Sequence, residues 1–463
     1  MAMKTDLQRL GLADLRDGLA KGWWSSRDIA EAYLARIAAL NPQLNAFALV
    51  MADEALADAE AADARRAKGE SLGTLDGLPI AVKDVCDIAG TPTGAGVKAW
   101  ANRIAQSTAP VIERLRSKGM VILGKTNMVE LALGGWGTNP FIGTPLNPWD
   151  RSEPRAPGGS SSGSAVAVAA GLVPVALGSD TGGSVRLPAS FNGLSGMKTT
   201  PGLIPITGTF PLTAHLDTIG FLARRISDVI EITDAVSEPG APVLAAKPFP
   251  EGKEPLAGLQ LAMIRDEDLP GEVDRAVREA VAQAAETLRS LGAVVEEVAP
   301  PFDFAELLAA NGRIILYDAW RLYQAHVEDL DTPCDPAVRE RLFMAREISE
   351  ADYNHALEQR DRACAEWAAW VAHWPGGLLL PCTPTPAPTL RSLASGWSSC
   401  ALLTAAGNFV DAATMSLPIG FTSEGLPIGA QLMGPAWSEW RLAAIGDVFQ
   451  RVTDWHLRCP YRT

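Results

Sequence analysis

An unbroken run of glycine and serine, Gly158 to Ser164, stands directly before the apolar stretch AVAVAAGLVPVALGSD. By composition alone, such a run is typical of a flexible linker. The stretch that follows it predicts a buried helix and then a buried strand. A flexible linker is not expected directly before buried elements. We therefore expect this run to have a fixed conformation and a role in the chemistry of the protein.

Helices and short apolar strands alternate along the first half of the chain. The predicted order is two helices in residues 5–40, a helix at 51–67, a strand at 77–85, a helix ending at Gly119 and a strand at 120–124. Ser25 and Asp28 form a capping-box pattern before the second helix. A second strand–helix–strand unit follows a proline-rich connection at 236–258. This alternation is typical of a layered α/β fold.

The charge of the chain excludes several classes of partner. The 463 residues have a formal net charge of −14, and the Lys/Arg cluster at 65–68 ends an acidic, alanine-rich helix, whereas nucleic-acid-binding proteins normally have a basic patch. The first residues lack the apolar stretch of a signal peptide. No uncharged apolar run reaches the length of about 18 residues that a membrane span needs. We therefore expect a cytoplasmic protein that binds neither nucleic acid nor membrane.

The cysteines and histidines predict no metal site. None of the six cysteines forms a C-x-x-C pair, and the five histidines are scattered without metal-ligand spacing. Small thiols in a reducing compartment are the simpler interpretation. We expect neither a metal ion nor another cofactor.

Two short motifs indicate other chemistries but conflict with their surroundings. GMVILGKT at Gly119–Thr126 fits the phosphate-binding pattern G-x-x-x-x-G-K-T, yet its four apolar residues predict a buried strand. GSSSG at Gly159–Gly163 fits the nucleophile elbow of α/β-hydrolases, with Ser161 as nucleophile and His215 as an available base. That elbow needs a preceding strand, whereas DRSEPRAPG contains two prolines. An esterase that uses Ser161 stays open as an alternative.

Three separated segments fit one another better. AVKDV places Lys83 at the end of an apolar strand, GGSSSGSAVAVAAG contains the glycine–serine run, and GSDTGGSVRLPAS ends in the pattern D-x-G-x-S-x-R-x-P. The last two segments match the signature stretch of the amidase signature family, which the chain resembles over about residues 25–450. The resemblance implies an α/β fold with a central mixed β-sheet flanked by helices on both faces, a three-layer sandwich. We expect one domain over residues 1–463.

The resemblance also implies a Ser-Ser-Lys triad. Ser184 corresponds to the nucleophile, Ser160 to a bridging serine that follows a cis peptide bond, and Lys83 to the base. A lysine acts as a base only when it is neutral, and burial lowers its pKa from about 10.4. Asp84, next in the chain, would oppose that shift if it lies close to the ammonium group.

The residues around the nucleophile are expected to support it. Glycines let several N–H groups converge on one point, which predicts an oxyanion hole. The resemblance assigns the oxyanion hole to Thr181, Gly182, Gly183 and Ser184, loop support to Ser161, Asp180 and Arg186, and a substrate pocket to Gly134, Gly135 and Trp136. Trp136 fits a packed core position equally well.

The resemblance implies a serine amidohydrolase that acts on carbon–nitrogen bonds other than peptide bonds. Amides, carbamates (including urethanes) and some esters are the substrate classes it implies, together with water. One alternative is the glutaminase component of a tRNA-dependent amidotransferase, although such proteins usually carry LDQIG where this chain has Thr218. A non-catalytic binding protein on the same fold is another, and the intact triad argues against it.

The substrate itself is not predicted by these motifs. A variable region at about 310–400 is expected to shape the pocket, and the tryptophans Trp136, Trp320 and Trp397 favour an apolar or aromatic substrate. Family members are often dimers, so the resemblance is compatible with a homodimer.

Overall fold

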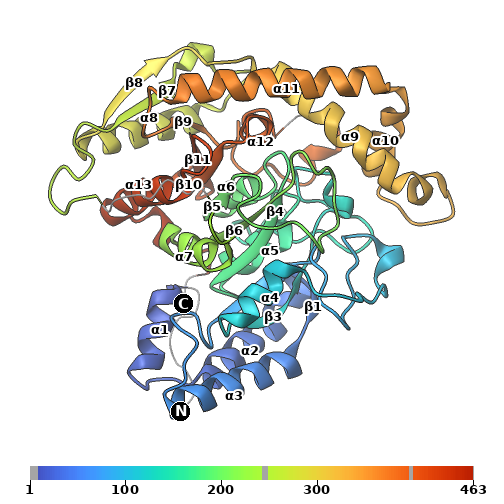
Figure 1. Cartoon of the computed structure of the whole chain (residues 1–463), viewed down its shortest axis with the longest axis vertical. Helices are drawn as coiled ribbons and strands as arrows, with labels where there is room; N and C mark the ends of the chain where they lie inside the picture. Colours follow the sequence, from blue (N-terminus) through green and yellow to red (C-terminus); the bar gives the residue numbers. More distant parts are fainter. Residues whose placement is uncertain (1–8, 242–248, 396–399, 462–463) are drawn as a thin grey trace.

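The computed structural model describes residues 9–241, 249–395 and 400–461. Within these residues the strands form an 11-stranded sheet in the order β1-β3-β2-β4-β6-β5-β10-β11-β9-β7-β8 (Figure 1). The strands are β1 Phe47–Val50, β2 Pro79–Lys83, β3 Val121–Thr126, β4 Val175–Asp180, β5 Ser195–Lys198, β6 Thr218–Ala223, β7 Gln260–Ile264, β8 Val294–Val298, β9 Leu378–Pro381, β10 Ala413–Phe421 and β11 Pro427–Gly434.

Thirteen α-helices lie among the remaining described residues. They are α1 Leu12–Ala20, α2 Ser26–Leu44, α3 Ala52–Lys68, α4 Pro110–Ser117, α5 Ser162–Ala169, α6 Arg186–Asn192, α7 Ile226–Val236, α8 Arg275–Ser290, α9 Phe304–Glu328, α10 Pro336–Met344, α11 Glu350–Val371, α12 Ala405–Phe409 and α13 Glu439–Val452. The capping box predicted before α2 is confirmed, with reciprocal bonds between Ser25 and Asp28. The helix ending at Gly119 is α4, and the strand after it extends to Thr126.

The sheet is mixed, as the resemblance implied. β2 pairs in parallel with β3 and β4, and β7 in parallel with β8 and β9, whereas β4, β6, β5, β10 and β11 pair in antiparallel fashion. Parallel neighbours end at the same edge of a sheet. Lys83, the last residue of β2, therefore lies at the same edge as Asp180, the last residue of β4.

Helices cover both faces of the sheet. A Cβ built on Gly429 and one built on Gly434 would lie on opposite faces of β11, because side chains alternate along a strand and the two positions differ by five. A Cβ on Gly429 would meet Ser190 of α6, whereas a Cβ on Gly434 would meet Leu442 of α13. Since α5 packs on α6 and α7 packs on α13, the two pairs form the outer layers and the predicted three-layer arrangement is confirmed.

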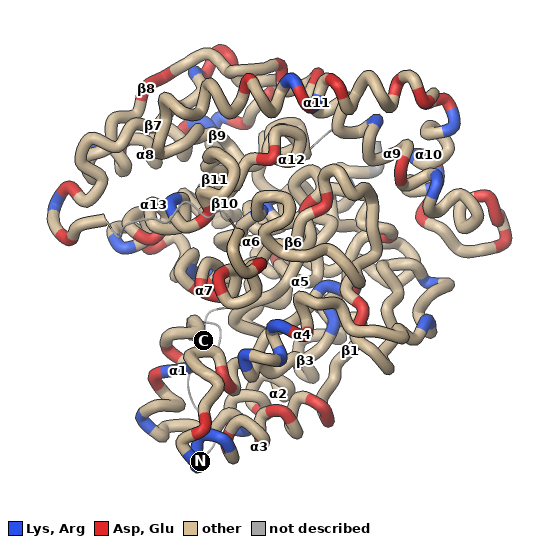
Figure 2. Tube along the Cα trace, viewed as in Figure 1, with Lys and Arg blue, Asp and Glu red and all other residues tan. Residues whose placement is uncertain are grey.

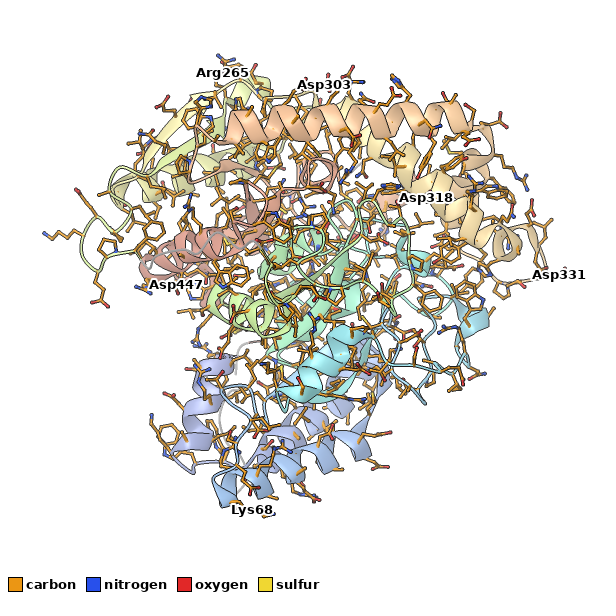
Figure 3. The ribbon with its side chains drawn as sticks, in the orientation of Figure 1. Lys68, Arg265, Asp303, Asp318, Asp331 and Asp447 are labelled. Carbon is orange, nitrogen blue, oxygen red and sulfur yellow. The ribbon has the colours of Figure 1, made fainter. Side chains whose placement is uncertain are left out.

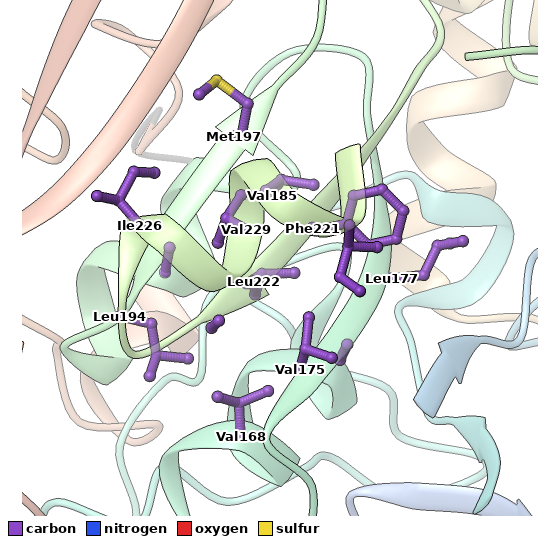
Figure 4. Packing of buried hydrophobic residues seen from close by; sticks show 14 of the residues in the cluster. Val168, Val175, Leu177, Val185, Leu194, Met197, Phe221, Leu222, Ile226 and Val229 are labelled. Atoms are coloured by element: carbon purple, nitrogen blue, oxygen red, sulfur yellow. The ribbon is translucent and has the colours of Figure 1, made fainter. Parts of the chain in front are cut away.

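Two clusters of buried apolar side chains hold these layers together. Figure 4 shows the central one, in which Val168 of α5, Leu222 of β6 and Val229 of α7 contribute to the same buried cluster. Burying one such side chain stabilises the fold by about 1.5–3 kcal/mol. A second cluster lies under α9, α10 and α11 and includes Ile314 and Trp367. The region expected to be variable thus has a core of its own.

The outer helices carry charges of both signs. Figure 2 shows Lys and Arg interspersed with Asp and Glu along α11. On α3 the acidic residues begin the helix and the basic residues end it, an order that complements the helix dipole. None of the helices in the described residues is long and apolar enough to cross a membrane.

Candidate active site

The glycine–serine run and the segment after β4 meet at the edge where β2 and β4 end. The N–H of Ser161 donates to the carbonyl of Ser184 over 3.2 Å, which joins the two segments directly. Between Ala156 and Thr200, Ser179, Gly182 and Ser184 alone are partly exposed, and the other residues are buried. The three partly exposed positions in this otherwise buried stretch are therefore the predicted nucleophile, Ser184, and two residues near it.

Lys83 contacts the predicted bridging serine. Its Nζ donates to Ser160 Oγ over 2.7 Å and to Ser179 Oγ over 2.8 Å. Burial lowers the pKa of Lys83 to about 7, against the opposing charges of Asp180 and Asp217. A lysine with this pKa is largely neutral at mildly alkaline pH.

Asp84 does not act on Lys83 in the way that its position in the sequence suggested. Its carboxylate lies 2.7 Å from the ammonium group of Lys125, which is fully buried. Lys125 also donates to Pro92 and Thr93. The GKT sequence that resembled a phosphate loop is therefore the end of the buried strand β3, and its lysine is held by an internal ion pair.

The glycine–serine run has a fixed conformation, as its position predicted. The peptide bond between Gly159 and Ser160 is cis, in agreement with the expectation from the resemblance. The N–H of Gly159 donates to the carbonyl of Gly135 over 2.7 Å, and a Cβ on Gly159 would lie 2.7 Å from the carbonyl oxygen of Gly134. A larger residue than glycine would push these two backbones apart.

Ser161 is tied into the backbone next to the site. Its Oγ donates to the carbonyl of Ser179 and accepts from the N–H of Ser179. The residue is fully buried, and no histidine forms a hydrogen bond with it among the described residues. These bonds fit the predicted role in loop support and leave the esterase alternative without a base.

Asp180 and Arg186 form a buried frame around the segment that carries the predicted nucleophile, Ser184. Burial favours a higher pKa for Asp180, but the charge and hydrogen bonds of Arg186 hold it well below its ordinary value. The guanidinium contacts both carboxylate oxygens at 3.0–3.1 Å. The remaining contacts of Arg186 go to Thr404, Asn408 and Gln431.

The four residues assigned to the oxyanion hole do not have equivalent N–H groups. The N–H of Gly183 donates to Asp180 over 2.7 Å, so it is directed into the frame rather than toward the opening. The N–H groups of Thr181, Gly182 and Ser184 have no hydrogen-bond acceptor among the described residues. Within the same residues, the side chains of Ser184 and Ser160 form no hydrogen bond with each other.

The predicted pocket residues lie against the glycine–serine run. The carbonyl of Trp136 accepts from the N–H of Gly158, and its ring is stacked on Phe191 with a centroid distance of 6.0 Å. A Cβ on Gly135 would lie 2.4 Å from Cys400 Sγ. Gly134, Gly135 and Trp136 are each partly exposed.

The other tryptophans have different surroundings. Trp320 packs on Phe343 and on the guanidinium of Arg346, in the second apolar cluster. Trp397 lies outside the described residues. The tryptophans therefore carry no argument for an aromatic substrate beyond the position of Trp136.

Two site neighbours were not anticipated from the sequence. Asn311 of α9 is buried, and its Nδ2 donates to the carbonyl of Thr181 over 3.5 Å. Its Oδ1 would lie 3.4 Å from a Cβ on Gly182. Asp217 accepts from the hydroxyl of Thr181 over 2.6 Å. Asp217 lies directly before β6, in the LDTIG segment, but no local pattern marks Asn311 within its helix.

A family model described as "Amidase" matches residues 28–443. The chain belongs to this amidase signature family. The A component of the glutamyl-tRNA(Gln) amidotransferase from Chloroflexus aggregans is 35% identical, over 98% of this chain and 99% of the relative. The protein of the same name from Azotobacter vinelandii is 36% identical over the same shares of both chains.

Solved structures of other amidase signature proteins have the same fold. One is described as part of a vestigial protein complex that reveals the origins of an s-triazine catabolic enzyme. It has a TM-score of 0.87 and 31% identity, and covers 97% of this chain and 100% of that chain. The native peptide amidase from Stenotrophomonas maltophilia has a TM-score of 0.81 and 29% identity, with coverage of 95% and 96%. A peptide amidase in this group removes the basis for restricting the family's C–N chemistry to bonds other than peptide bonds.

Proposed function

We propose that this chain cleaves the C–N bond of a carboxamide through an acyl-enzyme on Ser184, with Lys83 as base and Ser160 as proton relay. The observation that carries the proposal is the buried contact of 2.7 Å between Lys83 Nζ and Ser160 Oγ. Burial lowers the pKa of this lysine to about 7. A buried, neutral amine beside a hydroxyl is the arrangement needed to activate a serine.

The reaction follows from these positions. Neutral Lys83 takes the proton of Ser160, and Ser160 takes the proton of Ser184 as its oxygen attacks the acyl carbon. Before this transfer, rotation of the partly exposed Ser184 side chain brings its hydroxyl to Ser160. The proton returns along the same path to the leaving nitrogen, and water attacks the resulting ester in the second half of the cycle.

The N–H groups of Thr181, Gly182 and Ser184 supply the oxyanion donors. Each lacks an acceptor among the described residues, whereas Gly183 donates to Asp180. The loss of one such donor typically lowers the rate by about 10²–10³. Asp180 and Arg186 hold the segment in place from its buried side.

The glutaminase component of a tRNA-dependent amidotransferase is the second candidate, and the comparisons favour it over a free-standing amidase. The curated relatives described above are such components and match almost the whole chain. A glutaminase would use the same acyl-enzyme, with glutamine as the carboxamide and ammonia as the leaving group. This chain has Thr218 in place of the glutamine of LDQIG, and this difference favours a substrate other than glutamine.

The nucleophile is tested by labelling. The protein is treated with a fluorophosphonate or a sulfonyl fluoride, digested, and mapped by mass spectrometry. We expect the label on Ser184, its loss in Ser184→Ala, and its retention in the matched variant Ser161→Ala. A label on Ser161 would instead contradict the proposed mechanism and restore the esterase alternative.

The substrate is tested by measuring ammonia release. The chain is assayed alone with glutamine, peptide amides, aryl amides and carbamates, and again with the other components of the Azotobacter vinelandii amidotransferase. Turnover of small amides by the isolated chain, unaffected by those components, supports the amidase. Glutamine turnover that appears only with the added components and a charged tRNA supports the glutaminase.

A further inference from the structure

A second cluster of potential ligand side chains includes Glu130. Glu130 is next in the chain to Val129, whose N–H donates to the carbonyl of Ser160. Glu130, His326 and Cys334 each present one potential ligand atom, and these atoms lie within 4.8 Å of one another. The side chain of Glu130 is fully buried, and that of His326 is 5% exposed. A carboxylate, an imidazole and a thiol are the ligand types that zinc takes in proteins. We propose that these three side chains bind a zinc ion.

The spacing of the ligand atoms suits such an ion. Glu130 Oε1 lies 3.0 Å from His326 Nε2. With Zn–N and Zn–O bonds of about 2.0–2.2 Å, the corresponding edge of a tetrahedron is about 3.3–3.6 Å. The two side chains need to separate by only a few tenths of an ångström to admit the metal. Three protein ligands leave a fourth position for water.

Neighbouring groups orient the ligands from outside. The N–H of Asp335 donates to Glu130 Oε2 over 2.9 Å, which leaves Oε1 to face the imidazole. The ring of Trp100 packs on His326 with a centroid distance of 5.1 Å. Partners that fix the direction of a ligand in this way are a regular feature of metal sites.

The charges also balance when zinc is bound. A divalent cation with one carboxylate, one thiolate and one neutral imidazole is electroneutral, as a buried site requires. Zinc binding replaces the S–H bond with a Zn–S bond and releases one proton to solvent.

The three ligands come from different parts of the fold. His326 lies near the end of α9, Cys334 lies on the connection from α9 to α10, and Glu130 follows β3. Asp331, labelled in Figure 3, marks the same connection at the edge of the molecule. Val129, beside Glu130, donates its N–H to the carbonyl of Ser160 over 3.3 Å. Zinc would therefore attach the α9–α10 connection to the framework of the active site.

The test uses the full chain and does not depend on its catalytic activity. Protein stripped of metal with a chelator is titrated with Co²⁺, which reports a thiolate ligand through a near-ultraviolet charge-transfer band. We expect one equivalent to bind, with the band present, and zinc to displace it. Cys334→Ser should lose the band, whereas the control Cys364→Ser should keep it, because Cys364 lies against Phe409 and Asp411 instead.

Two results would overturn the proposal. The first is folded wild-type protein that binds no cobalt and retains no zinc after gel filtration, measured by plasma mass spectrometry. The second is a charge-transfer band that persists in Cys334→Ser. If that variant does not fold, X-ray absorption of the zinc-loaded wild-type protein decides: one sulfur ligand supports the site, and a coordination sphere without sulfur rejects it.

Discussion

Lys83 and Ser160 meet at 2.7 Å although 77 positions separate them in the chain. Lys83 ends β2, and Ser160 stands in the turn before α5. The contact exists because β2 and β4 are parallel neighbours and because the glycine–serine run closes over their common edge. Its chemical meaning rests on the neutral form of the lysine, which the following predictions address.

Replacing Lys83 by methionine should lower kcat/KM by about 10²–10⁴, the range expected when a general base is lost. The apolar side chain fills the buried site, so circular dichroism and the urea midpoint should stay close to wild type. Lys68→Met, at the exposed end of α3 (Figure 3), is the control and should leave the rate unchanged. Near wild-type activity in Lys83→Met would exclude Lys83 as the base.

The pH profile of kcat/KM should rise with pH and level off above about 7, because burial lowers the pKa of Lys83 to about 7. Only the deprotonated amine accepts a proton, so activity is lost as pH falls through this value. Below the midpoint the slope should be about tenfold per pH unit. A profile measured over pH 5–9 that instead falls toward alkaline pH would contradict a neutral lysine base.

Asp180→Asn should reduce the free energy of unfolding by about 3–5 kcal/mol, because it leaves the fully buried Arg186 without its counter-charge. Urea denaturation measures the loss. Asp447→Asn breaks a pair with Arg451 on the surface of α13 and should cost less than about 0.5 kcal/mol. Equal losses in the two variants would show that the buried pair does not frame the nucleophile segment.

Asn311 on α9 should influence the N–H groups proposed as oxyanion donors. Asn311→Ala removes a contact with Thr181 and is expected to lower kcat more than it raises KM. Asn311→Asp should be slower still, since a carboxylate would stand near the developing negative charge. Gln324→Glu makes the equivalent change at an exposed position of the same helix and should be silent. If the Asp and Ala variants are equally active, Asn311 has no electrostatic role.

Much of this site could be predicted from the sequence because its residues lie in short segments of distinctive composition. The run Gly158–Ser164 and the D-x-G-x-S-x-R-x-P pattern indicated the family, and the structure agrees on the cis bond after Gly159 and on the fold. Alternating apolar segments were sufficient to place β2 and β3. Such patterns can be recognised from the sequence because each depends only on residues within one short segment.

Other features depend on tertiary contacts that leave no local trace. The partner of Asp84 is Lys125 rather than Lys83, because adjacent parallel strands bring them together. Asn311 and the cluster at Glu130 depend on how α9 lies over the sheet, and 196 positions separate Glu130 from His326. The sequence likewise could not show that Asp180 accepts the N–H groups of Gly183 and Val185, whereas the N–H of Ser184 between them is left without an acceptor among the described residues.

The burial of the stretch from Ala156 to Thr200 has a consequence for how this enzyme can change. Nearly every side chain in it is enclosed by others, so a new residue there alters packing before it alters chemistry. Substitutions that change the substrate are therefore expected in the elements that lie beside the partly exposed residues Ser179, Gly182 and Ser184. A directed-evolution library should therefore target α9 around Asn311 and the residues around Thr404, which contact Thr181 and Gly182, with the central segment left untouched.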